Sequence, residues 1–277
     1  MVTATAAAST DMKALTRELR VDIIRMIEAA GSGHPGGSLS VIDLLSVLYF
    51  RVLRHRPAEP LWPDRDRVIL SKGHAAPALY AVMAKAGYFP RERLNTLRKL
   101  GSPLQGHPDR LRLPGIEVST GSLGQGLSIA VGMALAARLD KKGFKTWCFL
   151  GDGEAQEGQV WEALMCAPKF KLDNLVAVFD YNGGQIDGSV KDVMDLEPLA
   201  DKVRAFNWDT IVIDGHALAA IEAAYAQAMR ASGRPTAIVA RTCKGKGVSF
   251  MEHPCEWHGK APNKAEADRA VQELSNG

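Results

Sequence analysis

The residues best suited to chemistry in this 277-residue chain are an aspartate and an asparagine that each follow a short apolar run. Asp152 stands in Gly151-Asp152-Gly153-Glu154, and Asn182 stands in Asp180-Tyr181-Asn182-Gly183-Gly184. A carboxylate and an amide oxygen are hard ligands that suit Mg²⁺, which keeps coordination positions open for diphosphate oxygens and water. Glycines that open a helix let backbone N–H groups approach a phosphate. The pair therefore predicts a metal-bound diphosphate site, although a tight strand–helix turn also explains a lone Gly-Asp-Gly.

The apolar runs before these residues alternate with helical patterns along the chain. Strands are expected at 67–70, 146–150, 175–179, 210–213 and 236–240. Helices are expected at about 15–27, after an Asp11 cap, and at 41–53, 74–87, 123–139, 155–167 and 216–231. Strands that are apolar on both faces favour a doubly wound, mainly parallel α/β sheet flanked by helices. Because ligands bind at the carboxyl ends of such strands, Asp152 and Asn182 should lie at equivalent tips of neighbouring strands.

Composition narrows the class of ligand. The chain is 46% hydrophobic, and 34 basic against 31 acidic side chains leave a formal charge of +3 without a block of like charge. This balance argues against nucleic acid and membrane partners and favours a small anionic ligand. The N-terminus has neither the basic start nor the apolar stretch of a signal peptide, and no run reaches the length of a membrane span. We expect a flexible N-terminus over residues 1–10 and one domain over 11–277.

The spacing of the cysteines indicates whether the protein is expected in an oxidising or a reducing compartment. Cys148, Cys166, Cys243 and Cys255 form neither a C-x-x-C pair nor a disulfide framework. A reducing cytoplasm is therefore the expected location.

A dinucleotide-binding fold is the obvious rival, because Gly151 and Gly153 begin a G-x-G-x-x-G pattern. The third glycine is missing: position 156 is Gln, which is too large for the close helix–strand contact that the motif needs. The chain also has no G-x-x-x-x-G-K-[ST] loop. A nicotinamide-dependent oxidoreductase is disfavoured.

Six ordered motifs are spread over nearly the whole chain. Four of them carry a histidine in a glycine-containing segment. Singly, such a histidine is as well explained by capping of backbone groups, but together the four favour a polar wall around an anionic, hydroxyl-rich reaction centre. The motifs are Ser32-Gly33-His34-Pro35-Gly36-Gly37, Ser71-Lys72-Gly73-His74-Ala75, Gln105-Gly106-His107-Pro108, Thr120-Gly121-Ser122-Leu123-Gly124-Gln125-Gly126, Gly151-Asp152-Gly153-Glu154-Ala155-Gln156-Glu157-Gly158 and Trp257-His258-Gly259-Lys260-Ala261-Pro262. In this order they resemble the motifs of transketolase.

The resemblance implies a thiamine-diphosphate- and Mg²⁺-dependent enzyme that transfers a two-carbon ketol unit from a ketose phosphate to an aldose phosphate. It implies that His34, His107 and His258 are catalytic and face the sugar. It implies metal ligation by Asp152, Asn182 and the carbonyl of Gly184, where a glycine replaces the family's bulkier residue, and a subunit contact at Glu157. The implied cofactor-binding residues are Gly37, His74, Gly121, Ser122, Leu123, Gly151, Gly153, Glu154, Asn182, Lys244 and His258. His55, His216 and His253 match no motif and are expected to be structural or surface residues.

The family also needs a glutamate on the cofactor's aminopyrimidine ring, and that residue belongs to a second module. Nothing in 261–277 could form another sheet. The resemblance therefore implies the diphosphate-binding, N-terminal subunit of a split transketolase, with a partner subunit that carries the pyrimidine-binding module and the C-terminal domain, in an α2β2 assembly. The alternatives are a subunit of a deoxyxylulose-phosphate synthase-like or ketoacid dehydrogenase-like enzyme, or a non-catalytic thiamine-diphosphate-binding regulatory subunit.

Overall fold

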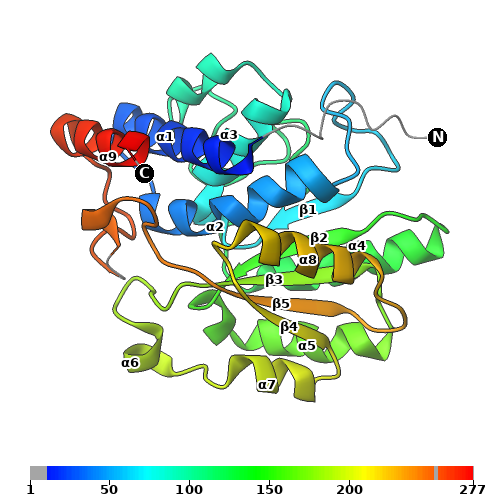
Figure 1. Cartoon of the computed structure of the whole chain (residues 1–277). Coiled ribbons are helices and arrows are strands. Elements are labelled where there is room, and N and C mark those ends of the chain that lie inside the picture. The colour runs from blue at the N-terminus through cyan, green and yellow to red at the C-terminus, as the bar shows by residue number, and fades with distance from the viewer. Residues whose placement is uncertain (1–10, 253–254, 277) are drawn as a thin grey trace.

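The computed structural model of this chain describes residues 11–252 and 255–276, and within them the strands form one parallel sheet (Figure 1). The strand order is β1-β2-β3-β5-β4, and every neighbouring pair is parallel. The expected doubly wound α/β fold is confirmed. The expected flexible segment, 1–10, lies outside the described residues. The strands are β1 (Arg67–Leu70), β2 (Thr146–Gly151), β3 (Leu175–Tyr181), β4 (Asp209–Asp214) and β5 (Thr236–Arg241).

Helices cover both faces of the sheet, and alternate side chains of one strand supply the two cores. Trp147 and Phe149 of β2 point into the core under the first group of helices, whereas Cys148 and Leu150 point into the other core. This alternation is the geometry of an extended strand buried on both sides. The first group is α1 (Met12–Ala30), α2 (Pro35–Val47), α3 (Ala76–Ala86), α8 (Leu218–Met229) and α9 (Lys264–Asn276); the second is α4 (Gln125–Leu139), α5 (Gly158–Lys169) and α7 (Leu199–Ala205), with the short α6 (Val190–Met194) beside it.

The first helix follows the sequence pattern closely. The Asp11 carboxylate accepts hydrogen bonds from the backbone N–H groups of Lys13 and Ala14, at 2.9 and 3.3 Å, so the expected N-cap is confirmed. The helix ends at Gly31, whose φ of 62° is the left-handed conformation that glycine adopts without strain. Because α1 ends here, His34 lies in the short connection between α1 and the next helix.

The second helix begins at Pro35, six residues before the expected start at 41, and continues as a π-helical turn over Leu48–Val52. Proline is favourable at the first position of a helix, because its missing N–H would have no partner there. Gly36 is required by packing: a Cβ at this position would lie 2.9 Å from the carbonyl oxygen of Trp257. Pro35 and Gly36, which suggested the absence of a helix, therefore begin α2, and Gly36 allows the first motif to pack closely against the last.

Four other helices begin later than expected, and in three of them, α3, α4 and α5, this places motif residues before the helix. His74 lies in a 3₁₀ turn, η2 (Gly73–Ala75), Leu123 lies before α4, and Glu154–Gln156 form a 3₁₀ turn, η4, before α5. Glu157 was expected within a helix, but its extended backbone places it just before α5. The remaining 3₁₀ turns are η3 (Arg91–Thr96) and η5 (Ser249–Met251).

One strand departs from the expectation that all are buried on both faces. β4 is one of the two edge strands of the sheet, and Val212 near its centre is 42% exposed. No helix in the described part of the chain is both long and apolar enough to cross a membrane. All four cysteines are free thiols.

Candidate functional site

The ends of β2 and β3 bring the predicted Asp152 and Asn182 to one edge of the sheet. Gly151 pairs with Asp180 across the two strands, so the residues that follow are neighbours. The Asp152 carboxylate accepts hydrogen bonds from the backbone N–H of Gly183 at 2.5 Å and of Gly153 at 2.8 Å. The two strand tips are thus joined directly through the backbone.

A cavity of about 300 Å³, which we call the Asp152 cavity, opens beside these tips. Its wall combines hard oxygen donors at one edge with two lysines and two histidines at the others. The residues that line it are Gly37, Lys72, His74, Leu123, Gly151, Asp152, Gly153, Glu154, Gln156, Glu157, Asn182, Gly184, Gln185, Ile186, Lys244 and His258.

Asp152 is an under-compensated buried carboxylate. Its side chain is 2% exposed, and burial, opposed by the N–H groups of Gly183 and Gly153 and assisted by the Asp180 charge, raises its pKa to about 6. Among the residues that the structure describes, only backbone N–H groups donate to it. A buried carboxylate in this setting favours a bound cation that stabilises its charged form.

Beneath the cavity lies a buried ion pair that the sequence analysis did not assign. Lys72 follows the end of β1 and donates to the Asp180 carboxylate of β3 and, at 3.1 Å, to the carbonyl of Gly37. Ser40 donates to the same carboxylate at 2.5 Å. Burial alone would raise the pKa of Asp180, but the Lys72 ammonium and the hydroxyl donors of Ser40 and Thr242 lower it below its ordinary value. A charged residue inside an apolar strand was the available sequence signal.

Glu154 ties three motifs together. Its carboxylate accepts hydrogen bonds from the backbone N–H of Gly124 and of Gly151, both at 3.0 Å, and from the hydroxyl of Ser71. These bonds join the second, fourth and fifth motifs at one buried point. The side chain therefore positions the walls of the cavity.

The structure brings the four motif histidines together. The ring of His34 lies 5.3 Å from that of His74, 6.2 Å from that of His107 and 5.4 Å from that of His258, centroid to centroid. His74 and His258 are 5.2 Å apart and line the Asp152 cavity, whereas His34 and His107 lie beyond them. Four loops thus form one imidazole cluster next to the cavity.

Burial keeps these imidazoles neutral at pH 7. It lowers the pKa of His34 and of His258 from 6.5 to about 4, with further lowering by the nearby Arg98 and Lys244 charges. The pKa of His74 lies well below its ordinary value for the same reason, and that of His107 is lowered by burial and by Arg98.

We expect the folded chain to lose stability as pH falls from 6.5 towards 4. In this window the unfolded histidines take up protons that the folded cluster binds only at lower pH, so acid favours the unfolded state. Urea unfolding across the window measures the loss, and His34→Gln and His258→Gln should each make it shallower. A wild-type pH dependence that both variants reproduce would contradict this assignment.

Lys244 connects the cavity to the cluster. Its ammonium donates to the carbonyl of Gly184 at 2.8 Å and to Nδ1 of His258 at 2.9 Å, and burial lowers its pKa to about 8. Because an ammonium only donates, Nδ1 of His258 accepts and the proton of the neutral ring is on Nε2.

Arg98 is a second residue that the sequence analysis missed. Its guanidinium donates to the hydroxyl of Ser32 at 3.0 Å and lies 3.5 Å from Nδ1 of His34. Its φ of 58° is unusual for a non-glycine residue, and a Cβ at Gly106 would lie 2.8 Å from its Cζ atom. The third motif thus holds Arg98 against His34. No local pattern marks an isolated arginine of this kind.

Some predicted residues lie away from the cavity. Gly121 and Ser122 do not line it, and Gly121 instead packs against the His107 ring, from which a Cβ would be 2.9 Å away. His55 bonds to the hydroxyl of Tyr88 and the carbonyl of Tyr49, as expected of a structural histidine. His216 bonds to Asp43 and is also structural, whereas His253 lies outside the described residues.

The donor set fits Mg²⁺ with a diphosphate. Asp152, Asn182 and Gly184, which carry a carboxylate, an amide and a backbone carbonyl oxygen, line the cavity together with the cationic residues Lys72 and Lys244, which would offset negative charge. Gly37 leaves room for a ligand, since a Cβ there would already lie 3.3 Å from Nε2 of His74.

Comparison with known proteins identifies the family to which this chain belongs. The family model described as "Transketolase, thiamine diphosphate binding domain" matches residues 10–275. The chain is 47% identical to 6-deoxy-6-sulfo-D-fructose transketolase subunit SqwG of Clostridium sp. (strain MSTE9), over 95% of this chain and 96% of that one. It is 42% identical to an apulose-4-phosphate transketolase subunit of Phocaeicola vulgatus, over 92% of this chain and 91% of that one.

Longer relatives match over part of their length. The transketolase of Mus musculus is 44% identical over 95% of this chain but 42% of its own. The crystal structure of transketolase from Campylobacter jejuni superposes with a TM-score of 0.90 at 34% identity, again over 95% of this chain and 42% of that one. The chain therefore spans about two fifths of these relatives and nearly all of the two subunits. By sequence and fold it belongs to the transketolase family and corresponds to the family's thiamine diphosphate binding domain.

Proposed function

We propose that this chain is the diphosphate-binding subunit of a thiamine-diphosphate- and Mg²⁺-dependent transketolase that moves a two-carbon ketol unit from a ketose phosphate to an aldose phosphate. The observation that carries the proposal is the meeting of the Asp152 cavity with the four-histidine cluster. One part offers donors for a metal diphosphate, and the other offers neutral imidazoles for a hydroxyl-rich substrate. The free cysteines agree with a cytoplasmic location.

In the proposed site, each group has a physical task. Asp152, Asn182 and the Gly184 carbonyl would hold Mg²⁺, and Lys244 would offset the diphosphate charge. When bound, thiamine diphosphate supplies the nucleophile and the electron sink for ketol transfer. Neutral His34 and His258 would present Nε2–H groups to sugar oxygens, because Arg98 and Lys244 face their Nδ1 atoms. His107 would complete this wall, where neutral imidazoles orient hydroxyls and shuttle protons.

The remaining expectations concern assembly. We propose that a partner subunit supplies the pyrimidine-binding module with its activating glutamate, that two copies of each chain form an α2β2 assembly, and that Glu157 lies at a subunit contact. Two exposed apolar residues at the rim of the Asp152 cavity support a subunit contact there. Leu123 is 37% exposed and Ile186 is 65% exposed, and a partner subunit would cover them. Chain 11–277 would act as one domain in this assembly.

His34→Ala or His107→Ala is expected to lower ketol transfer by the reconstituted enzyme by about 10²–10⁴-fold, the range typical of groups that move protons. Thiamine diphosphate affinity should change far less, because both rings lie outside the Asp152 cavity. Transfer is measured with xylulose 5-phosphate, 6-deoxy-6-sulfo-D-fructose and apulose 4-phosphate as donors, and cofactor binding by calorimetry. His55→Gln, outside the cluster, is the control. An equal loss of cofactor affinity would reassign the two histidines to the diphosphate end.

A further inference from the structure

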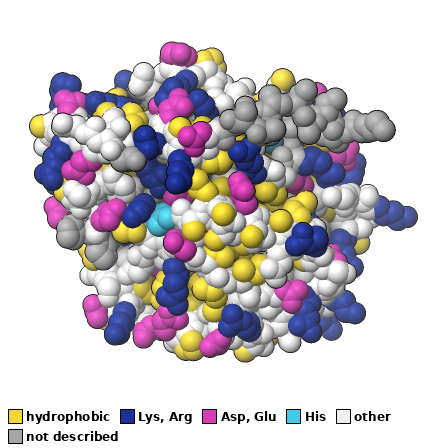
Figure 2. Space-filling view, viewed as in Figure 1, with side chains coloured by type: hydrophobic (Ala, Val, Ile, Leu, Met, Phe, Trp, Pro, Cys, Tyr) yellow, Lys and Arg dark blue, Asp and Glu magenta, His cyan; other side chains and the backbone are white. Residues whose placement is uncertain are grey.

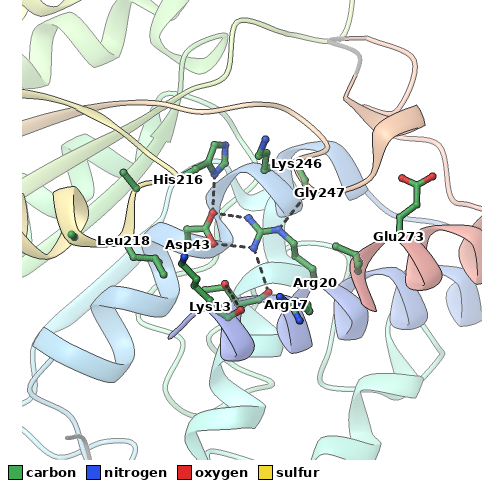
Figure 3. Close-up of a pocket in the computed structure, with 13 residues that line it drawn as sticks. Lys13, Arg17, Arg20, Asp43, His216, Leu218, Lys246, Gly247 and Glu273 are labelled. Atoms are coloured by element: carbon green, nitrogen blue, oxygen red, sulfur yellow. Dashed lines mark hydrogen bonds and ion pairs between the residues drawn. The ribbon is translucent and has the colours of Figure 1, made fainter. Parts of the chain in front are cut away.

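A second cavity, of about 650 Å³, is built by α1, the start of α8 and the segment that ends at Gly247 (Figure 3). We call it the α1 pocket. It shares no lining residue with the Asp152 cavity. Its lining residues are Lys13, Thr16, Arg17, Arg20, Asp43, His216, Ala217, Leu218, Ala219, Lys246, Gly247, Glu273 and Leu274.

The floor of the α1 pocket is a closed polar network. Arg20 forms two hydrogen bonds to the Asp43 carboxylate, at 2.9 and 2.6 Å, and its Nε donates to the carbonyl of Lys246 at 3.1 Å. His216 contacts the same carboxylate through Nδ1 at 2.8 Å, while its Nε2 accepts the N–H of Cys243 at 2.8 Å. Figure 3 shows Arg20 between Asp43 and Lys246. The floor is therefore satisfied, and its two charges cancel.

The wall of the α1 pocket carries uncompensated positive charge. Lys13 and Arg17 lie four residues apart on α1, which puts them on one face of the helix, and within 11–252 and 255–276 neither side chain has an ion-pair partner. The other charges of the wall are already engaged. Lys246 faces Glu252 at 3.5 Å, and the Glu273 carboxylate accepts from Ser249 and, at 3.2 Å, from Arg269.

The α1 pocket also has apolar lining residues. They are Leu218 and two alanines at the start of α8, and Leu274 of α9. Figure 2 shows hydrophobic side chains gathered over α8 at the centre of this face, with Lys and Arg side chains at the border of the patch. The exposed residues of α8 include Ala219, Ala223 and Met229. A ligand with a charged end and a carbon skeleton matches this combination of cationic and apolar lining residues.

We propose that the α1 pocket binds a small phosphate monoester, with Lys13 and Arg17 holding the phosphate. Two cations without an ion-pair partner among the described residues match the charge of about −1.5 to −2 that a phosphate monoester carries at pH 7, whereas a carboxylate offers one charge. Arginine adds a planar fork of donors suited to phosphate oxygens. The cavity volume of about 650 Å³ leaves room for the attached carbon skeleton. The inference is independent of ketol transfer.

The pocket adjoins the segment that carries Lys244. Cys243 is held by His216 and the Lys246 carbonyl by Arg20, while Lys244 between them reaches the Asp152 cavity. Substitutions in this segment would disturb both sites. Lys13 and Arg17 are outside it, so their replacement isolates the α1 pocket.

The test is thermal unfolding of the full chain over a range of inorganic phosphate concentrations, with sodium chloride holding the ionic strength constant. A ligand that binds only the folded state raises the unfolding temperature with a saturable dependence on its concentration. We expect saturation for the wild type, and for Lys13→Gln/Arg17→Gln an apparent Kd weaker by at least about tenfold, or no shift. Glycerol 3-phosphate should bind at least as tightly as inorganic phosphate.

The control is Lys169→Gln/Arg230→Gln, which removes one exposed lysine and one exposed arginine elsewhere and should keep the wild-type response. Thermal unfolding without phosphate checks that both double variants fold. If Lys13→Gln/Arg17→Gln does not fold, the single variants Lys13→Gln and Arg17→Gln replace it. The same saturable shift in the α1 variants and the wild type would overturn the proposal, as would a wild-type response no different from that to chloride. Tighter binding of malonate than of phosphate would overturn the phosphate assignment.

Discussion

Replacing Asp152 by alanine is expected to weaken Mg²⁺-dependent binding of thiamine diphosphate to the assembled enzyme by about a hundredfold or more. Loss of one partner of a buried, charged interaction typically costs about 3–5 kcal/mol, which corresponds to two or more decades in affinity. In this site the remaining proposed ligands, Asn182 and the Gly184 carbonyl, carry no formal charge to hold the metal against the diphosphate. Calorimetric titration of the cofactor, with and without Mg²⁺, measures the effect.

Two further variants sharpen this test. Asp152→Asn keeps the shape of the side chain but removes its charge, so it should lose most of the Mg²⁺ dependence if charge is what matters. Asp187→Ala removes an exposed carboxylate from the segment after β3 that also carries Asn182 and Gly184, and this variant should bind the cofactor as the wild type does. Unchanged Mg²⁺-dependent binding by folded Asp152→Ala would place the metal elsewhere.

Removing the buried carboxylate beneath the cavity is expected to destabilise the fold strongly. Asp180→Ala would leave the Lys72 ammonium, 1% exposed, with the Gly37 carbonyl as its hydrogen-bond acceptor. It would also remove the acceptor of the Thr242 hydroxyl and the nearer of the two acceptors of the Ser40 hydroxyl. Such a change typically costs about 3–5 kcal/mol in the free energy of unfolding. Urea unfolding at pH 7 measures it.

The matching experiment removes both charges. Lys72→Met/Asp180→Asn leaves no unpaired buried ion, so its loss of stability should be smaller than the sum of the two single losses. Asp201→Ala, which breaks an exposed ion pair with Arg204, should change stability by less than about 1 kcal/mol. Additive losses at Lys72 and Asp180 would show that the two groups do not depend on each other.

The parts of the fold that the sequence predicted are those with strong local patterns. β1 to β3 are apolar on both faces, and α1 has a regular apolar stripe with a cap at each end, so their positions follow from residue spacing. The tips that carry Asp152 and Asn182 follow from the ends of β2 and β3. Their meeting at one edge then follows from the parallel order of a doubly wound sheet.

Other features depend on contacts that a local pattern does not contain. The predicted start of α2 was wrong because proline and glycine usually interrupt helices, and Pro35 and Gly36 were interpreted in that way. The close contact with the Trp257 carbonyl oxygen explains the glycine at position 36. Short α6 and α7 carry too few turns for a periodic signal. The pairing of Lys72 with Asp180 joins residues 108 positions apart. Arg98 likewise reaches His34 through tertiary packing, so the sequence assigned the histidines but not the cation beside them.

The central claim is that this chain supplies the diphosphate half of a shared transketolase site. The most direct measurement is ketol transfer by the purified, mass-verified chain at saturating thiamine diphosphate and Mg²⁺, compared with the same chain mixed with a subunit that carries the pyrimidine-binding module. We expect no measurable turnover by the chain alone, because the aminopyrimidine end of the cofactor would be left in water, and turnover on mixing. Turnover by the chain alone that equals that of the mixture would contradict the claim.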